Sequence, residues 1–158
     1  MPTLHLMVGL PGSGKTTEAK RLAIQYHAVR LTPDEWQLRL YGSDFVPGAG
    51  NSEHDRRHTM IEEIMRELAR ELLNRGTDVI LDFGFWAKVE RDELRDLAQS
   101  LGADFRIHYM ACELDELWHR IEIRNRMADE LSVFRIGRAD LDEWYKLFEP
   151  PSDEELTN

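Results

Sequence analysis

The residues GLPGSGKT, from Gly9 to Thr16, form the clearest chemical motif of the sequence and match the phosphate-binding pattern GxxxxGK[ST]. Glycines let backbone N–H groups turn toward phosphate oxygens, and the helix expected after them presents its positive end to the same anion. Lys15 is expected beside the β- and γ-phosphates of ATP, and the Thr16 hydroxyl on Mg²⁺. A glycine-rich turn can also join a strand to a helix without binding anything, but the Lys-Thr pair and both flanking elements favour a phosphate site. The predicted ATP-binding residues are Gly9, Leu10, Pro11, Gly12, Ser13, Gly14, Lys15, Thr16 and Thr17.

A second candidate ligand for the metal is Asp82, which ends the apolar run Val79–Leu81. A carboxylate at the end of a buried strand can hold a metal-bound water beside a phosphate loop, so Thr16 and Asp82 are the predicted Mg²⁺ residues. The alternative is an acid that ends the strand and caps the next turn. The triplet that begins at Asp82 also spells the DFG of protein kinases, but the sequence has no HRD-type loop and is too short for that fold.

A candidate catalytic base, Asp34, lies in the first turn of a helix predicted from Thr32-Pro33-Asp34-Glu35. Thr32 and Glu35 predict a capping box, Pro33 suits the first helical position, and Gly42 is the expected end. Phosphoryl transfer needs a well-placed proton acceptor more than a strong one, so Asp34 could take the proton of an acceptor hydroxyl. An aspartate in a first helical turn is also common for electrostatic reasons alone, and both interpretations stay open.

Two arginines, Arg120 and Arg124, lie four residues apart on the predicted helix ELDELWHRIEIRNRM and should project together. They could neutralise the charge that develops on a triphosphate, as part of a lid that excludes water. The loop that follows adds Arg126, Arg135 and Arg138. The alternative is a solvated helix face on which Glu116 and Glu122 are the salt-bridge partners. The position of the pair after the fourth predicted strand favours the phosphate role, so Arg120 and Arg124 join Lys15 and Asp34 as candidate catalytic residues.

Short apolar runs that alternate with helical patterns predict the elements that position these groups. The runs are residues 4–8, 28–31, 79–81 and 105–110. Near-continuous apolar strands suit a parallel sheet covered on both faces, and right-handed crossovers bring the carboxyl ends of all strands to one edge. The fold class is therefore α/β, with the functional groups at that edge. Phe83, Phe85 and Trp86 fall near it, although core packing is favoured for at least two of them.

The strongest helical pattern runs from Glu53 to Arg75, with Gly76 as its expected cap. Its apolar stripe consists of Ile61, Ile64, Met65, Leu68, Ala69, Leu72 and Leu73. Met65 is assigned to the core and not to a ligand site. The linker-like segments are Ser43–Ser52 and the acidic stretch after Pro150 and Pro151.

Length and composition limit the classes of protein to consider. The 158 residues fit one domain, predicted over 1–150, with an acidic C-terminal tail over 151–158. The single cysteine allows no internal disulfide, no Cys/His pairing has zinc spacing, and no targeting or membrane segment is evident, so a cytoplasmic protein without a membrane partner is expected. The formal net charge of −10 disfavours extensive duplex nucleic-acid binding.

The sequence resembles the small P-loop kinases that include the polynucleotide 5′-hydroxyl kinase domain, chloramphenicol phosphotransferase and zeta toxin. The likeness covers roughly residues 4–148 and rests on GLPGSGKTT, LTPDEW, VILDFGFW and ELWHRIEIRNR. It implies a three-layer P-loop NTPase fold with a four-stranded parallel core and an arginine-containing lid. It also implies that Asp34 is the base for the acceptor hydroxyl and that Arg120 and Arg124 contact ATP phosphates. Polynucleotide kinases of this type carry an arginine one helical turn after the acid, where this sequence has Gln37, with Arg39 two residues further on.

The predicted function is transfer of the γ-phosphate of Mg-ATP to a hydroxyl of a small molecule that the sequence does not identify. ATP and Mg²⁺ are the expected cofactors, and a nucleic-acid partner is less favoured. One alternative is a polynucleotide 5′-hydroxyl kinase, for which Arg39, Arg56 and Arg57 would supply a local basic groove. A nucleotide-dependent ATPase or switch is the second alternative, although the sequence has no NKxD or LSGGQ motif. A binding-only ATP sensor is the third.

Overall fold

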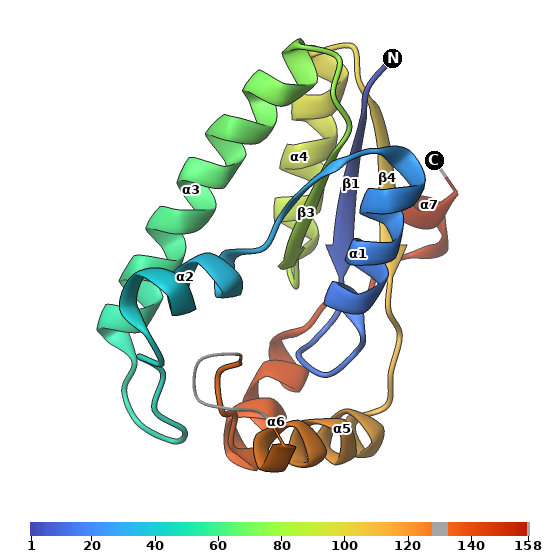
Figure 1. Cartoon of the computed structure of the whole chain (residues 1–158). Coiled ribbons are helices and arrows are strands. Elements are labelled where there is room, and N and C mark those ends of the chain that lie inside the picture. The colour runs from blue at the N-terminus through green and yellow to red at the C-terminus, as the bar shows by residue number, and fades with distance from the viewer. Residues whose placement is uncertain (128–132, 158) are drawn as a thin grey trace.

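A four-stranded parallel sheet forms the centre of the molecule, for which the computed structural model describes residues 1–127 and 133–157 (Figure 1). Its strands are β1 (Thr3–Val8), β2 (Val29–Leu31), β3 (Val79–Gly84) and β4 (Asp104–Tyr109). The order is β2-β3-β1-β4, and each neighbouring pair is parallel. The predicted α/β class and four-stranded parallel core are confirmed. β3 continues three residues beyond its apolar run, from Asp82 to Gly84.

Helices cover both faces of the sheet and make it a three-layer structure (Figure 1). The helix α1 (Lys15–Tyr26) packs on one face, and α3 (Ser52–Asn74) and α4 (Lys88–Ser100) pack on the other. The alternation of side chains along β1 explains this arrangement. Leu4 and Leu6 point into the core under α3 and α4, whereas Met7 packs with residues of α1.

The long helix α3 follows its prediction closely, since it begins one residue before Glu53 and ends one residue before Arg75. Gly76 adopts a φ of +78° directly after it, a conformation that favours glycine at a helix end. The prediction that Ile64 belongs to the buried stripe is wrong, because 52% of this residue is exposed. The buried positions of α3 recur every four residues, at Ile61, Met65, Ala69 and Leu73, so the covered stripe is narrower than the apolar pattern.

Three more helices lie toward the carboxyl ends of the strands (Figure 1). They are α2 (Pro33–Tyr41), α5 (Leu114–Met127) and α6 (Arg138–Leu147). A second hydrophobic cluster joins α5 and α6 to the phosphate loop through Leu10, Leu117, Ile121, Ile136 and Leu141. This cluster fixes the helix that carries Arg120 and Arg124 against the end of the sheet.

The stretch after Pro150 packs on the domain. Ser152 caps the short helix α7 (Asp153–Leu156), and its side chain accepts a hydrogen bond from the Glu155 backbone N–H at 3.3 Å. Glu155 is 5% exposed and pairs with Arg91, which is 0% exposed, through a 2.8 Å contact from Nε to Oε1. The Arg91 guanidinium also donates to the backbone carbonyls of Phe85 and Glu149, each at 3.0 Å. This buried ion pair therefore ties α7 to α4 and to the end of β3.

The helices are amphipathic rather than apolar on all sides. The longest, α3, has 23 residues and carries charged side chains along its outer face. In the described ranges, no helix combines the length and apolar character needed to cross a membrane.

Candidate functional site

The phosphate loop Gly9–Thr16 connects β1 to α1 and lies at the carboxyl edge of the sheet. The Gly9 N–H donates to the Gly84 carbonyl at 3.0 Å, which anchors the loop to the end of β3. Gly14 adopts a φ of +93° and is the N-cap of α1, so the open N-terminus of this helix faces the loop. Lys15 Nζ donates to the Leu10 carbonyl at 3.2 Å. Burial lowers the pKa of Lys15, while the charges of Asp82 and Asp34 oppose that shift. The loop thus has the form of an anion cradle.

Gly12 lies at a close contact between the phosphate loop and α5. Its φ is +83°, and a Cβ at this position would lie 3.0 Å from Ile121 Cγ1 and 3.1 Å from the Leu117 carbonyl oxygen. Arg120 Nη1 approaches the Gly12 carbonyl at 3.4 Å. Glycine is therefore needed here for two reasons, its backbone conformation and the direct approach of the arginine-bearing helix.

Asp82 accepts hydrogen bonds from two hydroxyl groups and keeps one oxygen free of partners. Thr16 Oγ1 donates to Asp82 Oδ2 at 2.7 Å, and Thr32 Oγ1 donates to the same oxygen at 3.1 Å. Asp82 is only 5% exposed, and its Oδ1 atom is buried without a hydrogen-bond partner. A buried carboxylate oxygen without a partner is costly unless a ligand or water completes it.

This oxygen set fits Mg²⁺. The described residues contain no group of three or more His, Cys, Asp or Glu side chains arranged to hold a metal. Mg²⁺ at phosphate sites instead takes one or two protein oxygens and fills its octahedron with water and phosphate oxygens. Asp82 with its free Oδ1 and the neighbouring Thr16 hydroxyl supply such a pair.

The predicted capping box of α2 is wrong. The Thr32 side chain makes no capping hydrogen bond, because its hydroxyl turns to Asp82 and accepts from Arg30. Glu35 pairs with the Arg30 guanidinium at 3.0 Å and does not turn back to the helix start. The bounds of α2 still follow from Pro33 at its beginning and Gly42, with a φ of +71°, at its end.

Asp34 lies beside a histidine of α3. His58 Nε2 is 3.1 Å from Asp34 Oδ1, and His58 Nδ1 is 3.4 Å from Glu62 Oε1. Although burial opposes ionisation, the hydrogen bond and charge of His58 hold the pKa of Asp34 below its ordinary value. Burial would lower the pKa of His58, but the same hydrogen bond and the nearby charges of Asp34, Glu62 and Asp55 raise it. The Asp34 carboxylate is thus held ionised at the lining of the cavity.

Arg120 and Arg124 have different surroundings. Arg120 Nε pairs with Glu116 at 2.9 Å. Glu116 is one of the two salt-bridge partners predicted if the arginine pair lay on a solvated helix face. Arg124 does not pair with Glu122, which lies 3.7 Å from Arg126. Arg124 Nε is buried and has no hydrogen-bond partner, and burial lowers the pKa of its guanidinium against the charge of Asp34. Arg124 is therefore the arginine of the pair that is available to an anion in the cavity.

The other lid arginines do not converge on the cavity. Arg138 pairs with Asp142 at 2.8 Å and with Asp115 at 3.2 Å, and neither Arg126, Arg135 nor Arg138 lines the cavity. The middle of the predicted lid, residues 128–132, lies outside the described residues.

One cavity of about 760 Å³ joins the phosphate loop to α2, α3 and α6. Lys15, Thr16, Asp34, Asp82, Arg120 and Arg124 all line it. The loop after α2 reaches across to α6, where the Gly48 N–H lies 3.2 Å from each oxygen of the Asp140 carboxylate. Of the three aromatic residues after Asp82, Phe85 is buried in the core, whereas Phe83 and Trp86 line the cavity. The structure thus brings the predicted catalytic and metal residues to a single space.

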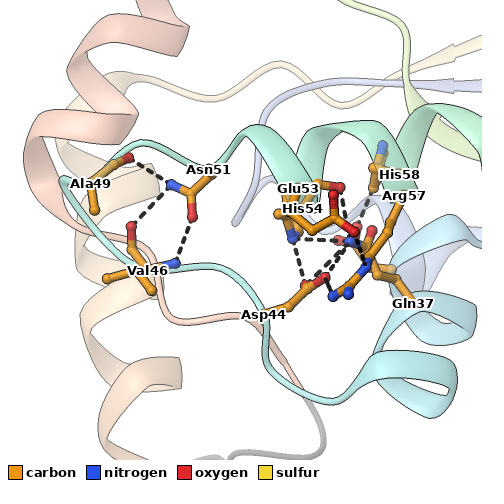
Figure 2. A network of polar contacts seen from close by, with 10 residues as sticks. Gln37, Asp44, Val46, Ala49, Asn51, Glu53, His54, Arg57 and His58 are labelled. Atoms are coloured by element: carbon orange, nitrogen blue, oxygen red, sulfur yellow. Dashed lines mark hydrogen bonds and ion pairs between the residues drawn. The ribbon is translucent and has the colours of Figure 1, made fainter.

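Gln37 lies in a network of polar contacts between α2, the loop after it and α3 (Figure 2), and it is not among the residues that line the cavity. It is 0% exposed, and its amide Nε2 donates to the two oxygens of Asp44, at 3.2 and 3.1 Å, and to the His54 carbonyl at 3.0 Å. His54 Nδ1 lies 2.7 Å from Asp44 Oδ1, and Arg57 Nη1 lies 3.1 Å from Asp44 Oδ2. The network clamps the loop between α2 and α3.

Two of the three arginines proposed for a nucleic-acid groove, Arg56 and Arg57, pair with acidic side chains. Arg57 is held by Asp44 and also lies over the Tyr41 ring, 4.3 Å from its centroid. Arg56 pairs with Glu53 at 2.8 Å. Neither of these arginines nor Arg39 lines the cavity.

Comparison with known proteins now adds to this geometry. Residues 4–151 match the model of a protein family described as an AAA domain. The chain belongs to this family. The match runs from β1 to the start of the C-terminal segment, so it includes the phosphate loop, Asp34, Asp82 and α5. Membership in this AAA domain family confirms the resemblance to small P-loop kinases and implies nucleotide binding.

The proteins to which the chain is similar include several kinases, at modest sequence identity. The chain is 25% identical to an adenylate kinase from Streptococcus pneumoniae (strain Hungary19A-6) over 150 residues, which cover 94% of this chain and 68% of that enzyme. Its fold is similar to that of a candidate kinase from Chloroflexus aurantiacus, with a TM-score of 0.74 at 20% identity over 96% of this chain and 82% of the other. A gluconokinase from Sinorhizobium meliloti 1021 gives a TM-score of 0.60 at 16% identity, with coverages of 97% and 78%. At these identities, the likeness to the solved structures shows the fold alone.

Two features of the site were missed in the sequence. The site roles of His58 and Glu62 were not predicted, because the pattern of their segment indicates only a surface helix with an apolar stripe. A signal was present, since His54, His58 and Glu62 recur every four residues and must share one helix face. The contact of Gly12 with α5 had no sequence signal, because every phosphate loop of this pattern carries glycines for its own conformation.

Proposed function

We propose that this protein is a Mg-ATP-dependent kinase that transfers the γ-phosphate to a hydroxyl group of a small molecule. The observation that supports it best is the convergence of an ionised carboxylate and two cationic side chains on one cavity. Lys15, Asp34 and Arg124 all line the space of about 760 Å³ above the phosphate loop. A site that only bound nucleotide would gain nothing from an ionised carboxylate held by His58 beside that cavity.

Asp34 serves as the proton acceptor in this proposal. The acceptor hydroxyl donates a hydrogen bond to the carboxylate oxygen of Asp34, and its own oxygen attacks the γ-phosphorus. The bond between that phosphorus and the bridging oxygen breaks, ADP takes the electron pair, and the hydroxyl proton passes to Asp34. A loose transition state needs little basicity, so a carboxylate with a lowered pKa is sufficient.

Lys15 and Arg124 neutralise the charge that develops during transfer. Lys15 follows the glycine turn and faces the position of the β- and γ-phosphates, and Arg124 approaches the same cavity from α5. Preorganised cations in a space with little water contribute more than they would in solution. Arg120 assists from the edge, where Glu116 already holds it.

Thr16 and Asp82 would hold the magnesium ion. When bound, Mg²⁺ would neutralise part of the negative charge of the phosphates. The Thr16 hydroxyl now donates to Asp82 Oδ2 and would turn its lone pair toward the ion, while Asp82 Oδ1 lacks any other partner. Thr32 keeps the Asp82 carboxylate in its orientation through the 3.1 Å hydrogen bond.

The alternatives have weaker support. The described cavity lining contains none of Arg39, Arg56 and Arg57, which disfavours a polynucleotide 5′-hydroxyl acceptor. A switch or assembly ATPase would leave the Asp34–His58 contact without a role.

The test is transfer of label from γ-labelled ATP in the presence of Mg²⁺. The purified protein is offered a pool of hydroxyl-bearing metabolites and antibiotics, and separately a 5′-hydroxyl oligonucleotide, with Asp34→Asn as the matched control. Label that moves to a small molecule only when Asp34 is intact supports the proposal. Label on the oligonucleotide would favour the alternative, a polynucleotide 5′-hydroxyl kinase. Free phosphate released equally by both proteins would favour an ATPase.

Lys15→Ala tests separately the part of the proposal that concerns nucleotide binding. The variant should fold, because Lys15 makes one polar contact to the Leu10 carbonyl and otherwise faces the cavity. Calorimetry should show much weaker Mg-ATP binding at an unchanged unfolding temperature. Unaltered affinity for ATP would remove the assignment of Gly9–Thr16 as the phosphate site.

A further inference from the structure

One half of the cavity is built from aromatic rings in mutual contact. His54 packs edge-on against Phe45 and Phe134, with ring centroids 5.1 and 4.9 Å apart. Phe45 lies 5.8 Å from Trp144, and Trp144 lies 5.7 Å from Trp86. All five residues line the cavity. This aromatic wall, made of Phe45, His54, Trp86, Phe134 and Trp144, joins α3 to α6 and to the end of β3.

Core packing does not account for the whole aromatic wall. Trp86 and Trp144 pack on the cluster around Leu117 and Ile121, yet both are only partly buried. Phe45 comes from the loop after α2 and is also partly buried. The rings therefore cover the hydrophobic cluster on one side and face the cavity on the other, as expected for a ligand-binding wall.

The same half of the cavity has neither lysine nor arginine among its described lining residues, and its protonated histidine, His58, is already paired with Asp34 and Glu62. The cationic residues among the described lining residues, histidines aside, are Lys15, Lys20, Arg120 and Arg124. All of these lie on the phosphate loop, on α1 or on α5, where a triphosphate would engage them. The stretch 128–132, ADELS, adds neither lysine nor arginine to the sequence.

Acidic side chains lie in the first turns of α2 and α3, the two helices that border this half of the cavity. Asp34 and Glu35 lie in the first turn of α2, and Asp55 lies in the first turn of α3. These carboxylates take the electropositive helix ends that a ligand phosphate would otherwise use. Asp34 is paired with His58 and Glu35 with Arg30, so Asp55 is the carboxylate that a phosphate or carboxylate on the acceptor would meet as a like charge. This half of the lining supplies no guanidinium fork for such a group.

We infer that the aromatic wall is the acceptor subsite and that its ligand is a hydroxyl compound with an aromatic or apolar body, neutral or cationic, without a phosphate or carboxylate group. The inference rests on the proposed kinase function and narrows its substrate class. It excludes nucleoside monophosphates, sugar phosphates and sugar acids as acceptors. The hydroxyl of the ligand faces Asp34, and its body lies against Phe45 and Trp144.

Binding of matched probes to the protein saturated with ADP and Mg²⁺ tests the inference. One pair is adenosine and adenosine monophosphate, and the other is 2-amino-1-phenylethanol and mandelate, which differ in an amine and a carboxylate. Saturation with ADP keeps the probes out of the nucleotide position. By calorimetry, the uncharged or cationic member of each pair should bind at least about tenfold more tightly than its anionic partner, because like-charge juxtaposition is costly.

Two variants distinguish the contribution of the aromatic wall to probe binding from the contribution of the acidic side chains. Phe45→Ala should weaken binding of both favoured probes and leave the affinity for ADP unchanged, whereas Leu147→Ala, at an exposed position of α6, should change neither. Asp55→Arg should reduce or reverse the preference within each pair. Tighter binding of the anionic members by the unmodified protein, or binding of none of the four probes, would overturn the inference. Either result is distinct from failure of the kinase proposal, which is judged by Asp34-dependent transfer of label.

Discussion

His58 Nε2 lies 3.1 Å from Asp34 Oδ1, so a residue of α3 orients the carboxylate that opens α2. The same imidazole contacts Glu62 at 3.4 Å on its other side. Two carboxylates thus favour the protonated ring. The pKa of His58 is raised above the ordinary 6.5, despite the opposing effect of burial. The stability that this contact adds is therefore present below pH 6.5 and is lost as the pH rises through the raised pKa.

Asp34→Asn should lower the pKa of His58. The substitution removes the hydrogen-bonding carboxylate and its charge, which are the main causes that raise this pKa. Titration of the imidazole protons by NMR measures it without any acceptor. An unchanged pKa would show that the contact does not form in solution.

His58→Gln should shift the acidic limb of the transfer rate to higher pH. Without the imidazolium, the pKa of Asp34 rises toward or above its ordinary 3.8, so protonation inactivates the base at a higher pH. The loss of kcat near neutral pH should be smaller than that of Asp34→Asn, for which about 10²- to 10⁴-fold is expected. A uniform fall of the rate at every pH would indicate a purely structural role for His58.

Arg124→Gln should reduce kcat more than Arg120→Gln. Arg124 has a buried Nε without a partner and is free to meet the transferred phosphoryl group, whereas Glu116 already neutralises Arg120. Steady-state kinetics with ATP as the varied substrate separate the two arginines. Equal losses in both variants would contradict the difference that their surroundings predict.

Gly12→Ala should destabilise the protein and weaken nucleotide binding. The new Cβ would meet Ile121 Cγ1 at 3.0 Å and the Leu117 carbonyl at 3.1 Å, and overpacking of this kind costs about 1–3 kcal/mol. Gly102→Ala is the matched control, since Gly102 also has a positive φ, +67°, but no neighbouring atom within 4 Å. Urea unfolding of both variants isolates the contact with α5. Equal destabilisation would mean that backbone strain alone is responsible.

Glu155→Gln should destabilise the fold by about 3 kcal/mol at neutral pH. Burial opposes ionisation of Glu155, but the hydrogen bonds and charge of Arg91 lower its pKa to about 2 from the ordinary 4.5. The stability from this carboxylate is fully present above pH 4.5 and is lost as the pH falls through about 2. The difference between the two proteins should therefore shrink below pH 4.5. Glu143→Gln, at an exposed position of α6, should have little effect at any pH.

Local features of the fold were predictable because neighbouring residues determine them. The phosphate loop, the apolar strands and the end of α3 shortly before Gly76 all depend on patterns within a few residues. Asp82 was predictable as a site residue because parallel strands end at a common edge. The capping box at Thr32 failed for a non-local reason, since the hydroxyl had a competing partner in Asp82, fifty residues further on.

Contacts that join distant segments could not be predicted. Asp34 and His58 are separated by 24 positions, and the loop between α2 and α3 determines whether they meet. That loop depends in turn on Gln37, which reads in the sequence as a missing arginine but proves to be a buried clamp. The aromatic wall draws on the α2–α3 loop, α3, the residues just after β3, the segment before α6 and α6 itself, so no single window of sequence contains it.

The clamp formed by Gln37 and Asp44 makes the acceptor half of the cavity an exchangeable module. It holds the α2–α3 loop through contacts that leave the phosphate loop untouched. New side chains on this loop can therefore change what is phosphorylated without disturbing how phosphate is handled. Laboratory evolution aimed at a new acceptor should begin by randomising Phe45 and its neighbours while Gln37 and Asp44 are kept.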